Sequence, residues 1–63
     1  MRYQTSWSKS GSLRDRQVSA PLSSFDAAMS LAHEKKPHNR SVTILKEGSG
    51  INAGTFYLDF IVK

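Results

Sequence analysis

The fold is decided by the segment LSSFDAAMSLAHEKKP, residues 22–37, which has the spacing of one amphipathic helix. Its apolar side chains recur three or four residues apart, which places them on one face of an α-helix. They are Phe25, Ala28, Met29 and Ala32, with Leu31 widening the face. Polar side chains at 26, 30 and 34 fall on the opposite face, which should meet water. The segment therefore predicts a helix with one face to bury.

Local chemistry predicts where this helix begins and ends. Ser23 is a good N-cap, and Asp26 follows three residues later, where a carboxylate complements the helix dipole. Pro37 cannot donate an amide proton and disfavours helical geometry at the residue before it. The helix is therefore predicted over residues 24–36. Because a helix of this length is marginal alone in water, flanking strands must hold it.

Two segments before the helix have strand character. Residues 2–8 alternate, with Tyr3, Thr5 and Trp7 on the side fit for burial and polar residues on the other. A serine- and glycine-rich turn follows. Residues 13–19 have a poor apolar pattern and several charges, which favours a weak edge strand or an irregular arm.

Two further strands are predicted after the helix. Residues 41–47 alternate with Val42 and Ile44 directed inward, and residues 55–63 carry the strongest strand pattern of the chain. In this last strand the even-numbered positions form an unbroken apolar row and the odd-numbered positions a mixed row. The pattern predicts that the apolar row is buried, with Phe56, Leu58, Phe60 and Val62.

The predicted order is strand, weak strand, helix, strand, strand, over a chain too short for two cores. We therefore expect a single α+β domain, residues 1–63, with an antiparallel sheet of three to four strands and the helix packed on one face. The layout resembles that of small single-domain proteins of viruses and mobile elements, and no motif assigns a family. The predicted core consists of Tyr3, Trp7, Phe25, Ala28, Met29, Ala32, Val42, Ile44, Phe56, Leu58, Phe60 and Val62.

Composition limits the compartment and the partners. The chain has no cysteine, no apolar leader after Met1 and no apolar run long enough for a membrane span, so we expect a soluble protein of the cytoplasm or another intracellular space. The net charge is +4, and the isoelectric point is near 9.9. This charge favours a polyanionic partner, such as nucleic acid or an acidic protein surface.

No catalytic or ligand-binding motif is recognisable. The glycine-rich segment 48–54 lacks a lysine and leads into a strand, so it is interpreted as a hairpin loop and not a phosphate-binding loop. His33 and His38 do not share a helix face, and no third metal ligand accompanies them. No serine lies in a nucleophile motif. We therefore expect no enzymatic activity, no cofactor, no metal and no small-molecule substrate.

The basic residues carry the first functional hypothesis. Lys35, Lys36 and Arg40 cluster where the helix ends, beside His38, and a second group contains Arg14 and Arg16. Such side chains contact phosphates and provide affinity without reading sequence. They predict a small binding or regulatory protein that contacts nucleic acid or a nucleoprotein assembly, with Arg2 and Lys9 extending the surface.

The alternative is a protein–protein interaction module. Leu45, Tyr57 and Ile61 are expected together on the outward sheet face, and exposed apolar side chains on one patch often mark a partner surface. Such a face would suit an inhibitor, an accessory subunit or a homodimer. The competing interpretation is that the irregular segment 9–21 folds over this face and covers it.

Overall fold

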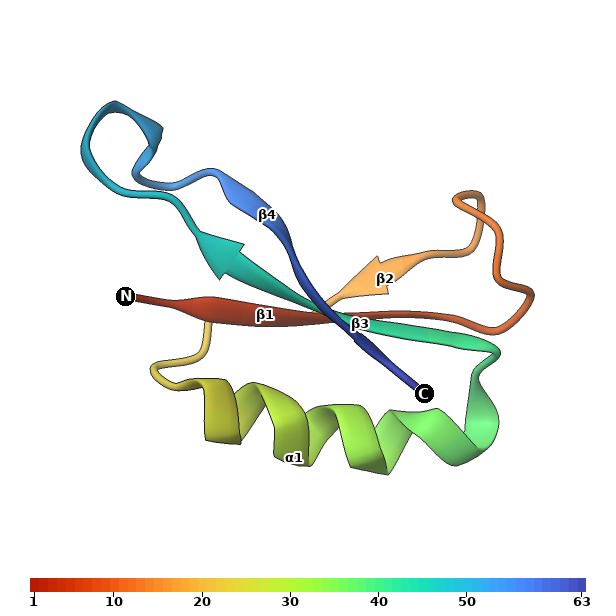
Figure 1. Ribbon diagram of the computed structural model, residues 1–63. Helices are drawn as coiled ribbons and strands as arrows, with labels where there is room; N and C mark the ends of the chain where they lie inside the picture. Colours follow the sequence, from red (N-terminus) through yellow and green to blue (C-terminus); the bar gives the residue numbers. More distant parts are fainter.

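The computed structural model describes residues 1–63 and confirms the α+β fold, a four-stranded antiparallel sheet with one helix across one face (Figure 1). The strands occur in the order β2-β1-β3-β4, so β2 and β4 are the edges. The elements are β1 (Tyr3–Ser8), β2 (Gln17–Val18), α1 (Phe25–Lys35), the 3-10 turn η1 (Lys36–His38), β3 (Ser41–Glu47), the 3-10 turn η2 (Gly50–Asn52) and β4 (Phe56–Val62). No helix has the length and apolarity needed to cross a bilayer.

The helix lies where it was predicted, with a different cap. Ser24, and not Ser23, is the N-cap, because Ser24 is the last residue with extended backbone and its Oγ accepts a hydrogen bond from the Ala27 amide at 3.1 Å. At the other end, the Asn39 side-chain amide donates to the Lys35 carbonyl at 2.8 Å. Two adjacent serines are chemically equivalent as caps, so residue type alone could not choose between them.

The core lies between α1 and the two central strands. Its fully enclosed apolar side chains are Ala28 and Ala32 from the helix and Val42, Ile44 and Val62 from the sheet. The two alanines let the helix approach the sheet closely. The buried Thr5 hydroxyl donates to the Ala28 carbonyl at 2.7 Å and ties β1 to α1. The half-buried side chains around this centre are Tyr3, Trp7, Leu22, Phe25 and Met29.

The predicted buried row of β4 is confirmed at Val62 and wrong at Leu58, because a β-bulge interrupts the strand. Phe60 pairs with Ile44, but the next pair is Leu58 with Leu45, which leaves Asp59 as the extra residue. Paired residues on antiparallel strands point to the same side. Leu58 therefore shares the outward face with Leu45, and 61% of it is exposed.

The two phenylalanines of β4 also differ from the prediction. Phe60 points to the helix side, where its ring meets the Phe25 ring edge-to-face at 6.0 Å, but 43% of it is exposed. The reason is that α1 packs over β1 and β3 and hardly reaches the β4 edge. Phe56 pairs with Glu47 and is half-buried under the Arg2 guanidinium, 5.8 Å from the ring centroid. Of the row, only Val62 is fully part of the core.

Of the segment 13–19, predicted as a weak edge strand or an irregular arm, only β2 (Gln17–Val18) pairs with β1, and a loop precedes it. Asp15 organises this loop: one carboxylate oxygen accepts from the Ser8 hydroxyl at 2.5 Å and the other from the Ser10 amide at 3.1 Å. These hydrogen bonds, with that of Ser8 the strongest, lower the pKa of Asp15. Gly11 adopts φ of +84°, which glycine tolerates at the tip of the loop.

A second carboxylate fastens the opposite end of the molecule. Arg2 donates to both oxygens of Glu47, at 3.0 and 2.7 Å, and the Gly54 amide donates to the same carboxylate at 2.9 Å. The hydrogen bond from Arg2 is the main reason that the pKa of Glu47 falls from 4.5 to about 2. Glu47 thus joins the N-terminus to the β3–β4 hairpin.

The salt bridge between Arg2 and Glu47 predicts a contribution to stability that is lost in acid. Because the folded pKa of Glu47 lies below its usual value, the contribution is complete above about pH 4.5 and disappears as the pH falls towards about 2. Chemical denaturation between pH 7 and pH 2 should therefore show a smaller decrease in unfolding free energy for Glu47→Gln than for the wild type. Equal decreases in the two proteins would show that the Arg2–Glu47 salt bridge does not stabilise the fold.

Candidate nucleic-acid interface

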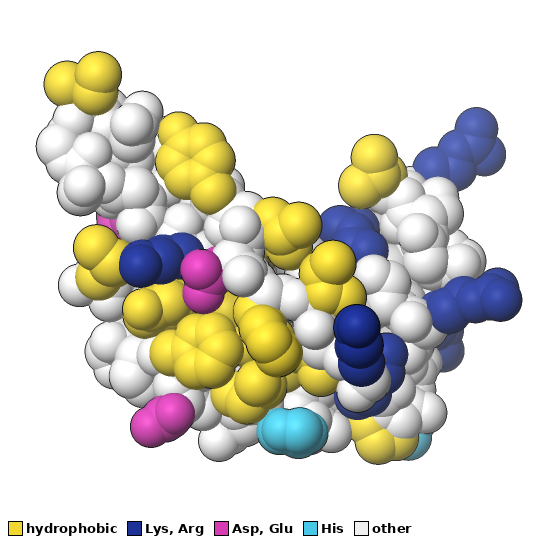
Figure 2. Space-filling model, in the orientation of Figure 1, with side chains coloured by type: hydrophobic (Ala, Val, Ile, Leu, Met, Phe, Trp, Pro, Cys, Tyr) yellow, Lys and Arg dark blue, Asp and Glu magenta, His cyan; other side chains and the backbone are white.

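The fold collects most of the positive charge at one end of the molecule. Of nine lysines and arginines, only Arg2 and Lys46 lie at the other end, near the β3–β4 hairpin and the start of β1. Figure 2 shows the basic side chains gathered over the β1–β2 loop and the C-terminal end of α1, whereas acidic ones lie mostly towards the opposite side. We call this region the basic end; its members are Lys9, Arg14, Arg16, Lys35, Lys36, Arg40 and Lys63.

Strand pairing brings the two predicted basic groups to this end. Ser8, the last residue of β1, pairs with Ser41, the first residue of β3, and the Arg40 amide donates to the Ser8 carbonyl at 3.0 Å. The segment 35–40 therefore meets the loop that follows β1. Arg2 does not join them: it lies at the opposite end, bound to Glu47, which corrects the expectation that it extends the surface.

A cleft of about 420 Å³ lies between the end of α1 and the β1–β2 loop. One of its walls is the Trp7 ring, with the Lys35 ammonium 4.5 Å from the ring centroid in a cation–π contact. The cleft is polar and carries both signs of charge. Its lining residues are Trp7, Lys9, Asp15, Gln17, Glu34, Lys35, His38 and Asn39.

The predicted basic residues differ in how freely they can contact a partner. Arg14 and Arg40 are exposed, and Lys35 and Lys36 are half-buried. None of them forms a salt bridge, because the salt bridge of this structure joins Arg2 to Glu47. They therefore have no carboxylate within ion-pair distance, although Asp15 and Glu34 line the same cleft.

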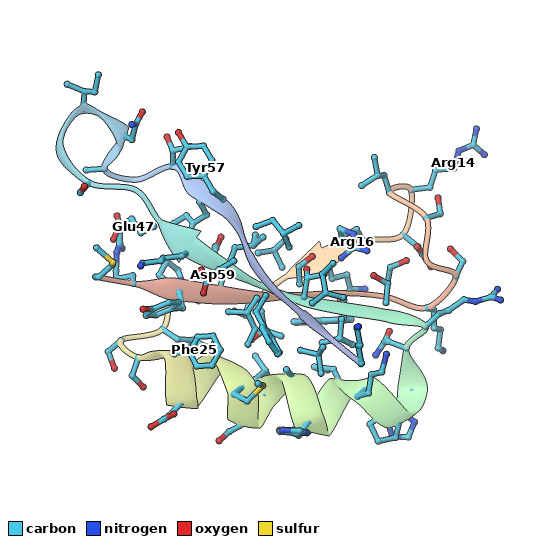
Figure 3. The ribbon with its side chains drawn as sticks, in the orientation of Figure 1. Arg14, Arg16, Phe25, Glu47, Tyr57 and Asp59 are labelled. Carbon is cyan, nitrogen blue, oxygen red and sulfur yellow. The ribbon has the colours of Figure 1, made fainter.

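Arg16 is the exception among the predicted residues. Its two terminal nitrogens donate to the hydroxyls of Ser6 and Ser41, at 2.9 and 2.7 Å, and it is half-buried against the sheet. Figure 3 shows Arg16 directed at the sheet and Arg14 directed away from it. Arg16 is therefore a structural residue that holds the loop, and the remaining basic residues form the candidate interface.

Sequence reasoning missed the part that Trp7 plays in this cleft. Trp7 was assigned to the core because it shares a face with Tyr3 and Thr5. It lies at the end of β1 where α1 stops, so one part of the ring packs on the core and another borders the cleft. Alternation along a strand gives the face of a residue and does not give its distance from the end of the covering helix.

The outward sheet face is the second candidate surface, in a corrected form. Tyr57 pairs with Lys46, so it does not share a face with Leu45 and Ile61; Leu58 occupies that place. The exposed apolar side chains of the face are Val18, Leu58 and Ile61, and Leu45 is half-buried among them. Figure 2 shows this face hollowed between the β1–β2 loop and the β3–β4 hairpin. The segment 9–21 contacts Ser6 through Arg16 and Ser8 through Asp15, and it leaves Leu58 and Ile61 exposed.

Comparison with protein-family models, with curated proteins and with solved structures finds no match to this chain.

Proposed function

We propose that the protein is a small, non-enzymatic nucleic-acid-binding protein whose basic end contacts the phosphate backbone. The observation that supports this most is the gathering at one end of positive side chains that form no salt bridge, from segments about 25 residues apart in sequence. Counterions released from a polyanion would provide the driving force for binding. The contacting residues in this proposal are Lys9, Arg14, Lys35, Lys36 and Arg40.

The proposed binding mode has little sequence preference. Lys35 already covers one face of Trp7, and the other ring that lines the cleft is the exposed His38 imidazole. Base stacking on Trp7, of the kind that single-strand-binding proteins use, would require Lys35 to move, which leaves one small ring, His38, for a base. Phosphate contacts position a protein on nucleic acid without reading bases. We therefore expect similar affinities for strands of different sequence and a steep dependence on salt.

The test measures fluorescence anisotropy of labelled DNA and RNA, single-stranded and duplex, over a series of salt concentrations. The triple substitution of Arg14, Lys36 and Arg40 by alanine should lower affinity at low salt by about tenfold or more. It should also reduce the slope of log K against log salt on duplex DNA by about 2 to 3, since each phosphate contact contributes about 0.9.

A matched control separates a local interface from overall charge. Arg40→Ala and Lys46→Ala each remove one positive charge, but Lys46 lies at the other end of the molecule. Arg40→Ala should weaken binding more than Lys46→Ala. Equal effects would indicate attraction by net charge alone, and absence of binding to every strand at low salt would refute the proposal.

A protein–protein interaction module remains the alternative proposal, supported by the exposed apolar side chains of Val18, Leu58 and Ile61 on the outward face. A partner recovered from the native host that stays bound after nuclease treatment would favour it. Loss of that partner through Leu58→Ser, with the basic end intact, would assign the contact to this face.

A further inference from the structure

The longer edge of the sheet is exposed on both of its faces. β4 has seven residues, whereas β2, the other edge, has two. Leu58 and Ile61 project to the outward side of β4, and Tyr57 and Phe60 project to the helix side; each is at least 43% exposed. A ligand lying on one face would cover only one of these pairs. A strand added alongside β4 would cover parts of both.

The helix side next to β4 is also incompletely filled. An open, mainly apolar groove of about 410 Å³ runs between α1 and β4, and it is lined by Met29, His33, Phe60, Ile61, Val62 and Lys63. It exists because α1 is centred over β1 and β3. Beyond β4 there is therefore no further strand, and α1 covers its helix side only in part.

The hydrogen-bonding groups of Ile61 face this open edge. The Glu47 backbone N–H donates to the Arg2 carbonyl, on the β1 side of β3. The next N–H, that of Gly48, donates to the Thr55 carbonyl, on the β4 side. By the alternation of antiparallel ladders, Val42 and Ile44 bond to β4 through Val62 and Phe60. The N–H and C=O of Ile61, between those two residues, must then point away from β3.

We propose that a second copy of this chain pairs antiparallel with β4, centred on Ile61. In that register Ile61 lies opposite Ile61 of the second copy on the outward side. Phe60 lies opposite Val62 on the helix side, so apolar meets apolar on both faces. Asp59 lies opposite Lys63 twice, which supplies charge complementarity. A two-fold axis through Ile61 generates all of these pairs and closes the assembly.

The bulge limits the length of this contact. Beyond Asp59 the β3–β4 hairpin turns away from the rest of the sheet, as Figure 1 shows. A bulge at an edge hinders pairing past that point. The contact therefore spans residues 59–63 of each copy and is small, so we expect a weak dimer with Kd in the micromolar range, about 1 µM or higher.

The dimer contact, residues 59–63, contains none of the five residues proposed to contact phosphate. The β1–β2 loop, with Lys9 and Arg14, lies on the opposite side of the sheet order from β4. Lys63 is the member of the basic end that the dimer contact would use. This inference therefore stands independently of nucleic-acid binding, and either one can fail without the other.

Sedimentation velocity over a range of protein concentrations tests the proposal. The wild type should shift from monomer to dimer, and Ile61→Lys should remain monomeric because two ammonium groups would meet at the axis. Leu58→Lys is the matched control: it lies on the same strand and the same face, but outside the paired residues, so its dimer should persist. Circular dichroism verifies that each variant folds.

Two further measurements identify the contact. Asp59→Lys and Lys63→Asp should each weaken the dimer, and the double variant should restore it. The Ile61 amide should exchange with solvent more slowly as protein concentration rises. A wild type that stays monomeric at every concentration would overturn the proposal. Equal disruption of the dimer by Leu58→Lys and Ile61→Lys would also overturn it, because the two copies would then pack through the outward sheet face.

Discussion

Replacing Ile44 by alanine is expected to leave most of the chain unfolded at room temperature. Ile44 is fully buried at the centre of the core, between α1 and the pair β1–β3. Truncating such a side chain removes buried apolar area and leaves a cavity, at a cost of about 2–5 kcal/mol. A domain of this size has a total stability of only about 3–5 kcal/mol. The expected cost of the substitution is therefore similar to the whole unfolding free energy of the domain.

The control for this substitution is Leu58→Ala. From the sequence, both residues belong to the predicted core, but the bulge at Asp59 turns Leu58 outward, where 61% of it is exposed. Its truncation should change the unfolding free energy by less than about 0.5 kcal/mol. Urea denaturation followed by far-ultraviolet circular dichroism measures both variants. Comparable destabilisation by the two would mean that β4 is not bulged and that Leu58 is buried.

The contrast between these two residues shows which parts of the fold the sequence could predict. In α1 the apolar residues occupy one stripe, so only one face can be buried, and the predicted face is the observed one. In β4 nearly every residue from Phe56 to Val62 is apolar. Alternation then permits either face to be inward, and a bulge can exchange the two without any local sequence signal.

The residues of the candidate interface could be predicted from the sequence, but their arrangement in the fold could not. The groups around Lys35 and around Arg14 were visible in the sequence. That they meet at one end depends on the pairing of Ser8 with Ser41, a long-range contact. The internal use of Arg16 depends on the same pairing, because its two hydroxyl partners come from β1 and β3.

Arg16 is the subject of the second large predicted effect. Its guanidinium bridges the hydroxyls of Ser6 and Ser41, and its buried Nε has no hydrogen-bond partner. In Arg16→Met the stem is kept, but the hydroxyl of Ser6, a residue that is only 2% exposed, loses its donor. We expect a loss of about 1–3 kcal/mol of unfolding free energy, the cost of leaving a buried polar group unsatisfied.

The same substitution should loosen the loop that Arg16 holds. The Ser10 amide is bonded to Asp15 within this loop, so its exchange with solvent should accelerate in Arg16→Met. Arg16→Lys should rescue only in part, because an ammonium group lacks the planar fork that reaches two hydroxyls at once. Arg14→Met is the control, since Arg14 is exposed and no hydrogen bond from its side chain is present; it should change stability by less than about 0.5 kcal/mol.

The two arginines thereby distinguish a structural role from a binding role. If Arg16 serves the fold, Arg16→Met lowers stability and changes nucleic-acid affinity little wherever the protein remains folded. Arg14→Met should do the reverse under the proposed function. If a variant of Arg16 kept full stability and lost affinity for nucleic acid, Arg16 would belong to the binding interface. Such a result would also show that the loop is held by Asp15 and by the pairing of Ser6 with Val18 alone.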